Sequence, residues 1–208
     1  SQLKDQLYTS HPYRYRNLAH GAQLSLWGIF KKLVIADRLN IIVSAIFSEP
    51  KCGSISAFGG LMYYIQLYAD FSGCMDLISG YSEMLGISLP NNFLYPFSAV
   101  SVKDFWRRWH ISLSSWLRDY VYIPLGGNRK GKVRQYINLI ITMFLGGLWH
   151  GAAWNFVFWG LLHGVALACH KFFRFVMGRD KTYQSTGFRR FLAVLVTFHF
   201  VCLCWIFF

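Results

Sequence analysis

Two histidines lie inside the most apolar stretch of the chain, LGGLWHGAAWNFVFWGLLHG at residues 145–164. They are His150 and His163, and no Asp, Glu, Lys or Arg occurs between Gln135 and His170. A titratable side chain at membrane depth costs free energy, so its presence there indicates a functional site by default. The first question is which chemistry these imidazoles could perform.

His150 suits the role of a general base that takes a proton from an attacking hydroxyl group. An unperturbed imidazole has a pKa of about 6.5, and burial of such a ring lowers its pKa, so the base is neutral at neutral pH. General-base catalysis typically contributes roughly 10²–10⁴ in rate. The alternative interpretation is a histidine that only hydrogen-bonds to a neighbouring helix.

The other histidines carry weaker signals. His110, in the run FWRRWHISLSSWLRDYVYIPL, could assist the base, bind the acceptor or polarise a thioester carbonyl, or it could be an ordinary interfacial residue. His163 and His170 lie seven residues apart, two turns along one helix face, which is more typical of packing or a polar helix end than of a ligand set. His199, alone in an apolar run, is interpreted as a packing residue. No HxxxH or HxxHH box occurs, so no metal site is predicted.

Two carboxylates, Asp70 and Asp76, lie in the long apolar run at 55–87. A charged side chain at mid-membrane costs about 2.5–3.5 kcal/mol on insertion scales, so each is expected to be paired or to face water. We expect Asp70 to have a structural role, and Asp76 to lie on a different face in another ion pair or at a helix end. The partners expected for Asp70 are Arg107, Arg108 and Arg118.

Composition indicates a membrane protein. The chain of 208 residues is 54% hydrophobic and 19% aromatic, and only 14% of its residues are charged. Soluble domains usually carry about 25% charged residues. The net charge of +12 lies in short blocks between apolar runs, as the positive-inside rule expects of cytoplasmic loops. Nucleic-acid binding is disfavoured, because no basic soluble domain with interleaved aromatic residues is present. The five cysteines lack CxxC or zinc spacing and are interpreted mainly as buried thiols.

The first half of the chain predicts helices and one connector. Residues 17–47 are expected to form short or tilted helices, because charges at Lys31 and Lys32 leave neither half with the roughly 20 apolar residues that a span needs. The two lysine side chains are expected to reach the headgroups. Residues 55–87 are expected to span the membrane, and 89–97, with two prolines, to be extended.

The middle of the chain predicts an interfacial helix followed by a basic turn. Residues 101–125 mix Trp with Arg, which is typical of a helix lying in the interface, and the Ser101 and Asp104 pair resembles a capping box. The turn at 126–134 could attract the phosphates of a donor or could simply set the topology, and it lacks the spacing of a P-loop. The donor-phosphate candidates are Arg129, Lys130 and Lys132.

The uncharged segment 135–170 lies between two basic blocks, so an even number of crossings is expected. Its length allows two short helices, hinged near Gly146–Gly147 or Gly151, with His150 at the turning point. Because Ser1 is not an initiator methionine and the chain stops inside an apolar run, we interpret residues 1–208 as one membrane domain that is part of a longer protein.

Three blocks occur in a fixed order: YADFSGCMDL at 68–77, FWRRWHISLSSWLRDYVYIPLGGNRKG at 105–131, and the 145–164 stretch. Together they resemble the membrane-bound O-acyltransferase family, most closely its bacterial alginate O-acetyltransferase-like branch. The similarity covers roughly residues 60–170. The resemblance implies an all-α integral membrane bundle, with re-entrant and interfacial helices around a central tunnel.

The resemblance also implies an activity. Members move an acyl group from a cytoplasmic thioester donor to a hydroxyl acceptor, with His150 as the catalytic histidine and His110 in the same reaction chamber. We expect acetyl-CoA as the donor substrate with no bound cofactor, an exported polysaccharide as acceptor, and the bacterial cytoplasmic (inner) membrane, crossed several times, as the location. A periplasmic or extracellular partner of the SGNH serine-hydrolase type is also expected. The candidates for lining the tunnel or contacting substrate are Trp149, Trp109, Asn155, Asp70, Arg107 and Arg108.

Two alternatives stay open at this point. The nearer one is D-alanyl transfer to teichoic acid, in which a carrier protein supplies the thioester. The other is a transporter or channel, because intramembrane Asp and His residues and Gly-rich broken helices also suit a proton or substrate path. No inverted repeat is visible in the sequence, which weighs against transport.

Overall fold

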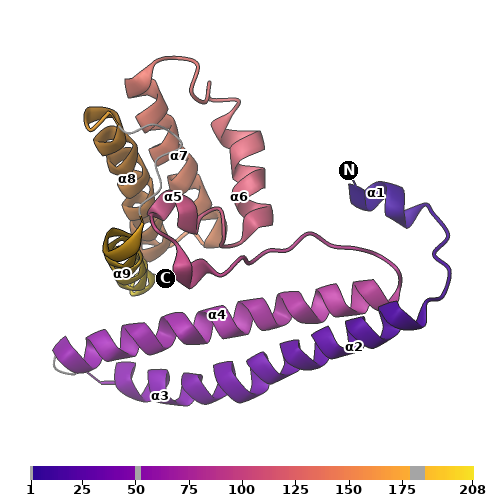
Figure 1. Ribbon diagram of the computed structural model, residues 1–208. Coiled ribbons are helices and arrows are strands. Elements are labelled where there is room, and N and C mark those ends of the chain that lie inside the picture. The colour runs from indigo at the N-terminus through magenta and orange to yellow at the C-terminus, as the bar shows by residue number, and fades with distance from the viewer. Residues whose placement is uncertain (1, 50–52, 179–185) are drawn as a thin grey trace. The chain divides into compact units, whose positions relative to one another are not determined.

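The regular elements of the chain are helical throughout the described part (Figure 1). The residues that the computed structural model describes are 2–49, 53–178 and 186–208. They divide into two compact units, residues 1–91 and 92–208, each of which is described by itself. The predicted all-helical class is confirmed, whereas the interpretation of residues 1–208 as one membrane domain stays a prediction.

In the first unit, one helical run lies along another (Figure 1). The elements are α1 (Gln2–Leu7), α2 (Tyr15–Ile29), the π-helical segment η1 (Phe30–Ala36), α3 (Asp37–Phe47) and α4 (Gly53–Met84). The short helices expected at 17–47 form as α2 and α3, and η1 joins them without a non-helical residue between. The π-helical turn carries the lysines through without a break, and π-turns of this kind are frequent at functional or strained positions.

Glycines allow α2 and α4 to approach at backbone distance. A Cβ atom added at Gly28 would lie 2.6 Å from the Gly73 carbonyl oxygen, and one added at Gly73 would lie 2.8 Å from the Gly28 oxygen. Gly21 and Gly80 face each other in the same way, seven residues before Gly28 on α2 and seven residues after Gly73 on α4. Small residues at both ends of this contact are typical of helix pairs in membranes, which associate through close packing.

The lysines of η1 pair with the carboxylates of α4. Lys31 Nζ lies 2.6 Å from Asp76 Oδ2 and donates to Ser72 Oγ at 3.1 Å, while Lys32 pairs with Asp70. Each lysine thus finds an opposite charge on α4, and the expectation that the two side chains reach the headgroups stays a prediction. The ion pair expected for Asp76 is confirmed, but the arginine partner expected for Asp70 is wrong. Two of those arginines pair elsewhere, Arg108 with Asp104 and Arg118 with Asp119.

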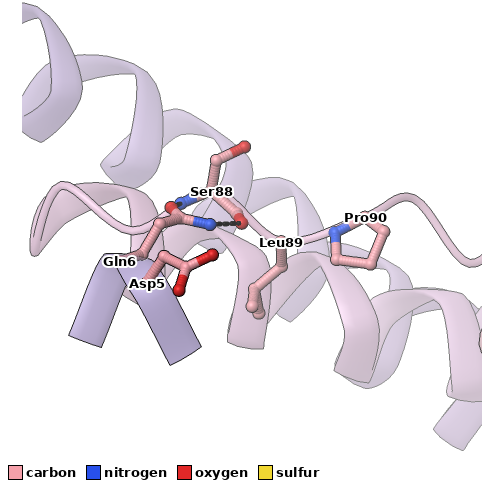
Figure 2. A pocket seen from close by; sticks show the side chains of 5 residues that line it. All are labelled: Asp5, Gln6, Ser88, Leu89 and Pro90. Atoms are coloured by element: carbon pink, nitrogen blue, oxygen red, sulfur yellow. Dashed lines mark hydrogen bonds between the residues drawn. The ribbon is translucent and has the colours of Figure 1, made fainter. Parts of the chain in front are cut away.

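The Gln6 side chain ties α1 to the segment that follows α4. Its amide nitrogen donates to the Ser88 carbonyl oxygen at 3.1 Å, and its amide oxygen accepts from the Ser88 N–H at 2.7 Å. Figure 2 shows the two bonds beside a shallow hollow of about 430 Å³, lined by these residues together with Asp5, Leu89 and Pro90. None of the residues expected to do chemistry lines this hollow.

The second unit contains five α-helices among its described residues. They are α5 (Val102–Phe105), α6 (Ile111–Leu117), α7 (Lys132–His150), α8 (Trp154–Val176) and α9 (Gly187–Trp205), with a 3₁₀ turn η2 (Pro96–Ser98) and a π-helical segment η3 (Arg118–Tyr122). The connector predicted at 89–97 has no regular element as far as residue 95, and its last two residues belong to η2.

The predicted interfacial helix at 101–125 begins where expected but does not run through. Ser101 Oγ accepts a hydrogen bond from the Asp104 N–H at 3.1 Å, which confirms the cap. The expectation of one continuous helix is wrong, because the chain turns between Phe105 and Ile111. The turn closes at His110, whose φ of 43° and ψ of 56° are left-handed.

The predicted hairpin in the uncharged segment is confirmed, with its hinge at Gly151, where α7 ends. Helices α7 and α8 pack along each other (Figure 1). A Cβ atom at Gly160 would collide with the Met143 carbonyl oxygen, and one at Gly147 would collide with the Phe156 carbonyl oxygen. The backbones therefore touch, and His150 is held at the end of α7.

Within the described residues, α8 and α9 are long and apolar enough to cross a membrane by length and composition. Helix α4, expected to span, forms as a helix but does not reach the same hydropathy, since Asp70, Asp76 and Glu83 lie within it. The helix expected at 55–87 is thus confirmed. Its expected role as a membrane span is not supported by its hydropathy.

We expect Gly73→Val to destabilise the first unit by about 1–3 kcal/mol, because the added side chain meets the backbone of α2. The matched control is Gly53→Ala, at a position where an added Cβ meets nothing within 4 Å. Thermal unfolding of the purified full-length protein in detergent measures the effect as a lower Tm for Gly73→Val than for the control. Equal Tm values in the two variants would show that the close contact between α2 and α4 does not stabilise the protein.

Candidate active site

The imidazole of His150 lies in an aromatic surround at the end of α7. The centroid of its ring lies 4.8 Å from that of Phe208, 5.0 Å from that of Trp149, 5.3 Å from that of Trp159 and 6.3 Å from that of Phe156. The side chain is half-buried. Three of these four contacts are edge-on, the geometry that aromatic pairs favour.

Within the second unit, no hydrogen bond or ion pair to the described residues holds the His150 ring. The aromatic contacts therefore set the orientation of the ring in this unit. In a Ser-His-Asp triad, by contrast, a carboxylate orients the histidine. Both ring nitrogens remain available to a reactant, one as acceptor and the other as donor. This is an arrangement that a general base can use directly.

His110 lies close to the same end of α7. Its ring centroid lies 6.3 Å from that of Trp149, the residue next to His150. Burial lowers the pKa of His110 to about 4, and the charge of His150 contributes to the same shift. A non-glycine residue with left-handed dihedrals is uncommon and is often found at functional positions. The structure thus brings together the two histidines that the sequence singled out.

Arg108 and Trp109 hold the turn that carries His110. The Arg108 guanidinium forms an ion pair with Asp104, with Nε 3.0 Å from Oδ1, and its Nη1 donates to the Leu94 carbonyl oxygen at 3.2 Å. Trp109 is buried, and its ring packs against rings of three segments: Phe93, Phe105 and Trp205. The contacts of both residues hold the turn against neighbouring segments of the protein. Contact with substrate stays a prediction for each.

The other predicted contact residues are distributed differently. Trp149 is 57% exposed and stands beside both histidines, so it is well placed to shape a pocket. Asn155 is exposed in the first turn of α8, and Arg107 is exposed in the turn after α5. Asp70 belongs to the first unit, where it pairs with Lys32.

Sequence reasoning treated His163 as a packing residue and missed its hydrogen bond. Trp106 Nε1 donates to His163 Nδ1 at 3.3 Å, across 57 residues of sequence. The His163 side chain is 0% exposed, and its Nε2 atom has no partner among the described residues. An unsatisfied buried polar group costs about 1–3 kcal/mol. The sequence held one signal for this hydrogen bond: a buried imidazole needs a hydrogen-bond partner, and Trp106, in the motif block of His110, offers an indole N–H.

Asn128 organises the basic turn before α7. Its side-chain oxygen accepts hydrogen bonds from Tyr122, Gln135 and Lys171, which lie on three different elements. Arg129 and Lys130 are exposed beside it. The ammonium of the third candidate, Lys132, lies 3.1 Å from the centroid of the Phe175 ring, in a cation–π contact. Arg129 and Lys130 are thus better placed than Lys132 to meet a phosphate. No cluster of three or more His, Cys, Asp or Glu residues that could hold a metal ion occurs in the described ranges.

Comparison with known proteins gives the class. The model of the membrane-bound O-acyltransferase family matches residues 1–208. The chain is 44% identical to a peptidoglycan O-acetyltransferase of Helicobacter pylori over its whole length, and 49% identical to the probable alginate O-acetylase AlgI of Azotobacter vinelandii over 75% of its length. It is 34% identical to the teichoic acid D-alanyltransferase of Bacillus subtilis over 84% of its length. The chain therefore belongs to the membrane-bound O-acyltransferase family, as the motif blocks predicted.

The chain spans less than half the length of these relatives. The matched region covers 38% of the Helicobacter protein, 32% of the Azotobacter protein and 47% of the Bacillus protein. Family membership favours acyl transfer over the transport alternative. The activity, substrates and partners of the whole protein are therefore proposed below.

The lowered pKa of His110 predicts acid sensitivity of the folded protein. With a pKa of about 4 when folded and about 6.5 when unfolded, the unfolded state binds the proton first as the pH falls. Stability linked to this group is therefore fully present above about pH 6.5 and is lost as the pH falls toward 4. We expect the Tm of His110→Gln to fall less than that of the parent protein between about pH 7.5 and about pH 5, measured by thermal unfolding in detergent. An equal or larger fall in the variant would show that His110 is not buried as described.

Proposed function

We propose that the protein is a membrane O-acetyltransferase in which His150 is the general base. The observation that carries this proposal is that His150 and His110 both lie beside Trp149 at one end of α7, in a chain of the acyltransferase family. The names of the relatives at 44% and 49% identity support acetyl as the acyl group. A tunnel that admits the donor from the cytoplasm and the acceptor from the other side belongs to the same proposal.

The reaction follows from the chemistry of a neutral imidazole. His150 takes the proton of the acceptor hydroxyl as its oxygen attacks the thioester carbonyl carbon. The C–S bond then breaks, the acetyl group passes to the oxygen, and the thiolate of the donor receives the proton from the imidazolium. His110, neutral because its pKa is lowered, can donate a hydrogen bond to the carbonyl oxygen as negative charge develops there.

The basic turn supports a thioester donor that carries phosphates. Arg129 and Lys130 are exposed on a turn that the Asn128 hydrogen bonds hold in place. Acetyl-CoA presents phosphates that such cations attract, and the acceptor is a hydroxyl group of an exported cell-surface polysaccharide. A partner of the SGNH serine-hydrolase type outside the cytoplasmic membrane completes the transfer.

A second candidate function is D-alanyl transfer to teichoic acid. The 34% identity to the Bacillus protein over 84% of this chain supports it, and the same two histidines could serve. In that case the thioester is carried by a protein, and the basic turn would meet an acidic protein surface instead of a nucleotide. The higher identity to the two acetyltransferase-type relatives favours acetyl transfer.

We expect His150→Ala in the full-length protein to abolish acetylation of the host's surface polysaccharide, with a loss of at least roughly 10²-fold. Ester-linked acetyl is quantified after mild alkaline release, and the membrane protein level is measured in parallel. His199→Ala is the matched control, since that exposed imidazole bonds, among the described residues, to the Leu195 carbonyl oxygen in its own helix. Unchanged acetylation in His150→Ala at a normal protein level would contradict the proposal. Ester-linked D-alanine in place of acetyl on the polymer modified by the parent protein would favour the second candidate function.

Replacing the exposed cations of the basic turn tests the donor. The Arg129→Gln/Lys130→Gln variant is expected to raise KM for acetyl-CoA several-fold at low salt while leaving kcat near the parent value, because the charges act on binding alone. The kinetics are measured on purified full-length protein at two salt concentrations. A KM that does not move at either concentration would contradict a role for these residues in binding donor phosphates.

A further inference from the structure

His163 is enclosed by aromatic rings from separate elements of the second unit. Its ring lies parallel to that of Phe105 at 6.2 Å and meets those of Trp106, Trp159 and Phe200 nearly edge-on at 5.2, 5.0 and 5.7 Å between centroids. These partners come from α5, the turn after it, α8 and α9. The imidazole is therefore a fixed part of the packed centre of this unit.

The hydrogen bond from Trp106 fixes the tautomer of His163. An indole N–H can only donate, so the accepting Nδ1 atom of His163 carries no proton and the proton of the ring lies on Nε2. That Nε2–H group is buried and meets no acceptor among the described residues. A leucine or phenylalanine would fill the same space without an unsatisfied donor. The imidazole is thus distinguished from an apolar packing residue by the single bond that it accepts.

Trp159 links His163 to the proposed base. The Trp159 ring is 1% exposed and lies edge-on to both histidines, with centroids 5.0 Å from that of His163 and 5.3 Å from that of His150. Trp106 also packs against Trp159, at 5.7 Å, and precedes His110 by four residues. The bond between Trp106 and His163 is therefore connected to both histidines of the site: to His150 through the Trp159 ring, and to His110 along the turn that follows Trp106.

We propose that His163 is a positioning residue for acyl transfer: by accepting the Trp106 hydrogen bond it holds the Trp159 ring against which His150 is oriented. The inference rests on the proposed role of His150 as base. His163 makes no contact with substrate in this role. Trp106, which donates the hydrogen bond, is a positioning residue for the same reason. Because no carboxylate among the described residues of the second unit orients the His150 ring, this aromatic support is what keeps the base in its reactive geometry.

Two replacements of His163 separate the hydrogen bond from packing. In His163→Asn the amide oxygen stands near the place of Nδ1 and can still accept from Trp106, whereas His163→Leu fills volume and cannot accept. Trp106→Phe removes the donor and keeps an aromatic ring. All are made in the full-length protein, and kcat, KM for acetyl-CoA and Tm are measured for each, with His199→Leu as the matched control on α9.

We expect His163→Leu and Trp106→Phe each to lower kcat roughly 10–100-fold with KM unchanged, as misplacement of a catalytic group does. His163→Asn should recover most of that loss, and the double variant Trp106→Phe/His163→Leu should be no worse than either single one. Two results would overturn the proposal: a kcat of His163→Leu equal to that of the control, or single effects that multiply in the double variant. If His163→Leu does not fold, the comparison of His163→Asn with Trp106→Phe decides.

A readout independent of turnover separates this inference from the proposed function. The rate at which diethyl pyrocarbonate modifies His150, followed by mass spectrometry, reports the accessibility and orientation of that ring. We expect His163→Leu to change this rate and His163→Asn to restore it, even if the protein transfers no acetyl group. An unchanged rate in His163→Leu would overturn the positioning role, whatever the activity of the parent protein.

Discussion

The site depends on how closely α7 and α8 approach each other. At Gly147 and Gly160 the two backbones touch, so that a methyl group at either position would collide with a carbonyl oxygen of the other helix. This contact, followed by the hinge at Gly151, places His150 at the end of one helix against Trp159 on the next. Helix pairs in membranes associate by such packing rather than by the hydrophobic effect, so small residues fix the geometry of the end that carries His150.

A second constraint joins the two motif blocks that carry histidines. The Trp106–His163 hydrogen bond ties the turn that ends at His110 to α8, and Arg108 ties the same turn to the connector at Leu94. The left-handed conformation of His110 is held from both sides. The fold therefore presents two neutral imidazoles together without a carboxylate between them, which suits a base and a hydrogen-bond donor acting on opposite parts of one thioester reaction.

The sequence predicted what local pattern and family motifs control. The Ser101 cap, the hinge at Gly151 and the nearness of His110 to the end of α7 could all be found in this way. Tertiary partners could not: the pairing of Lys31 and Lys32 with α4 depends on the register of two helices 38 to 45 residues apart, and no local signal gives that register. The break in the 101–125 helix was missed for a related reason, because the turn is held by contacts with Asn92 and Leu94 rather than by a breaker residue.

In the proposed function, His150 is the general base of the acyl transfer. This role is tested most directly by purified full-length protein in nanodiscs, supplied with acetyl-CoA, the polysaccharide acceptor and the SGNH-type partner, with release of the CoA thiol followed in time. The account predicts steady, acceptor-dependent release by the parent protein and none above background by His150→Gln. Equal release by both proteins would contradict it.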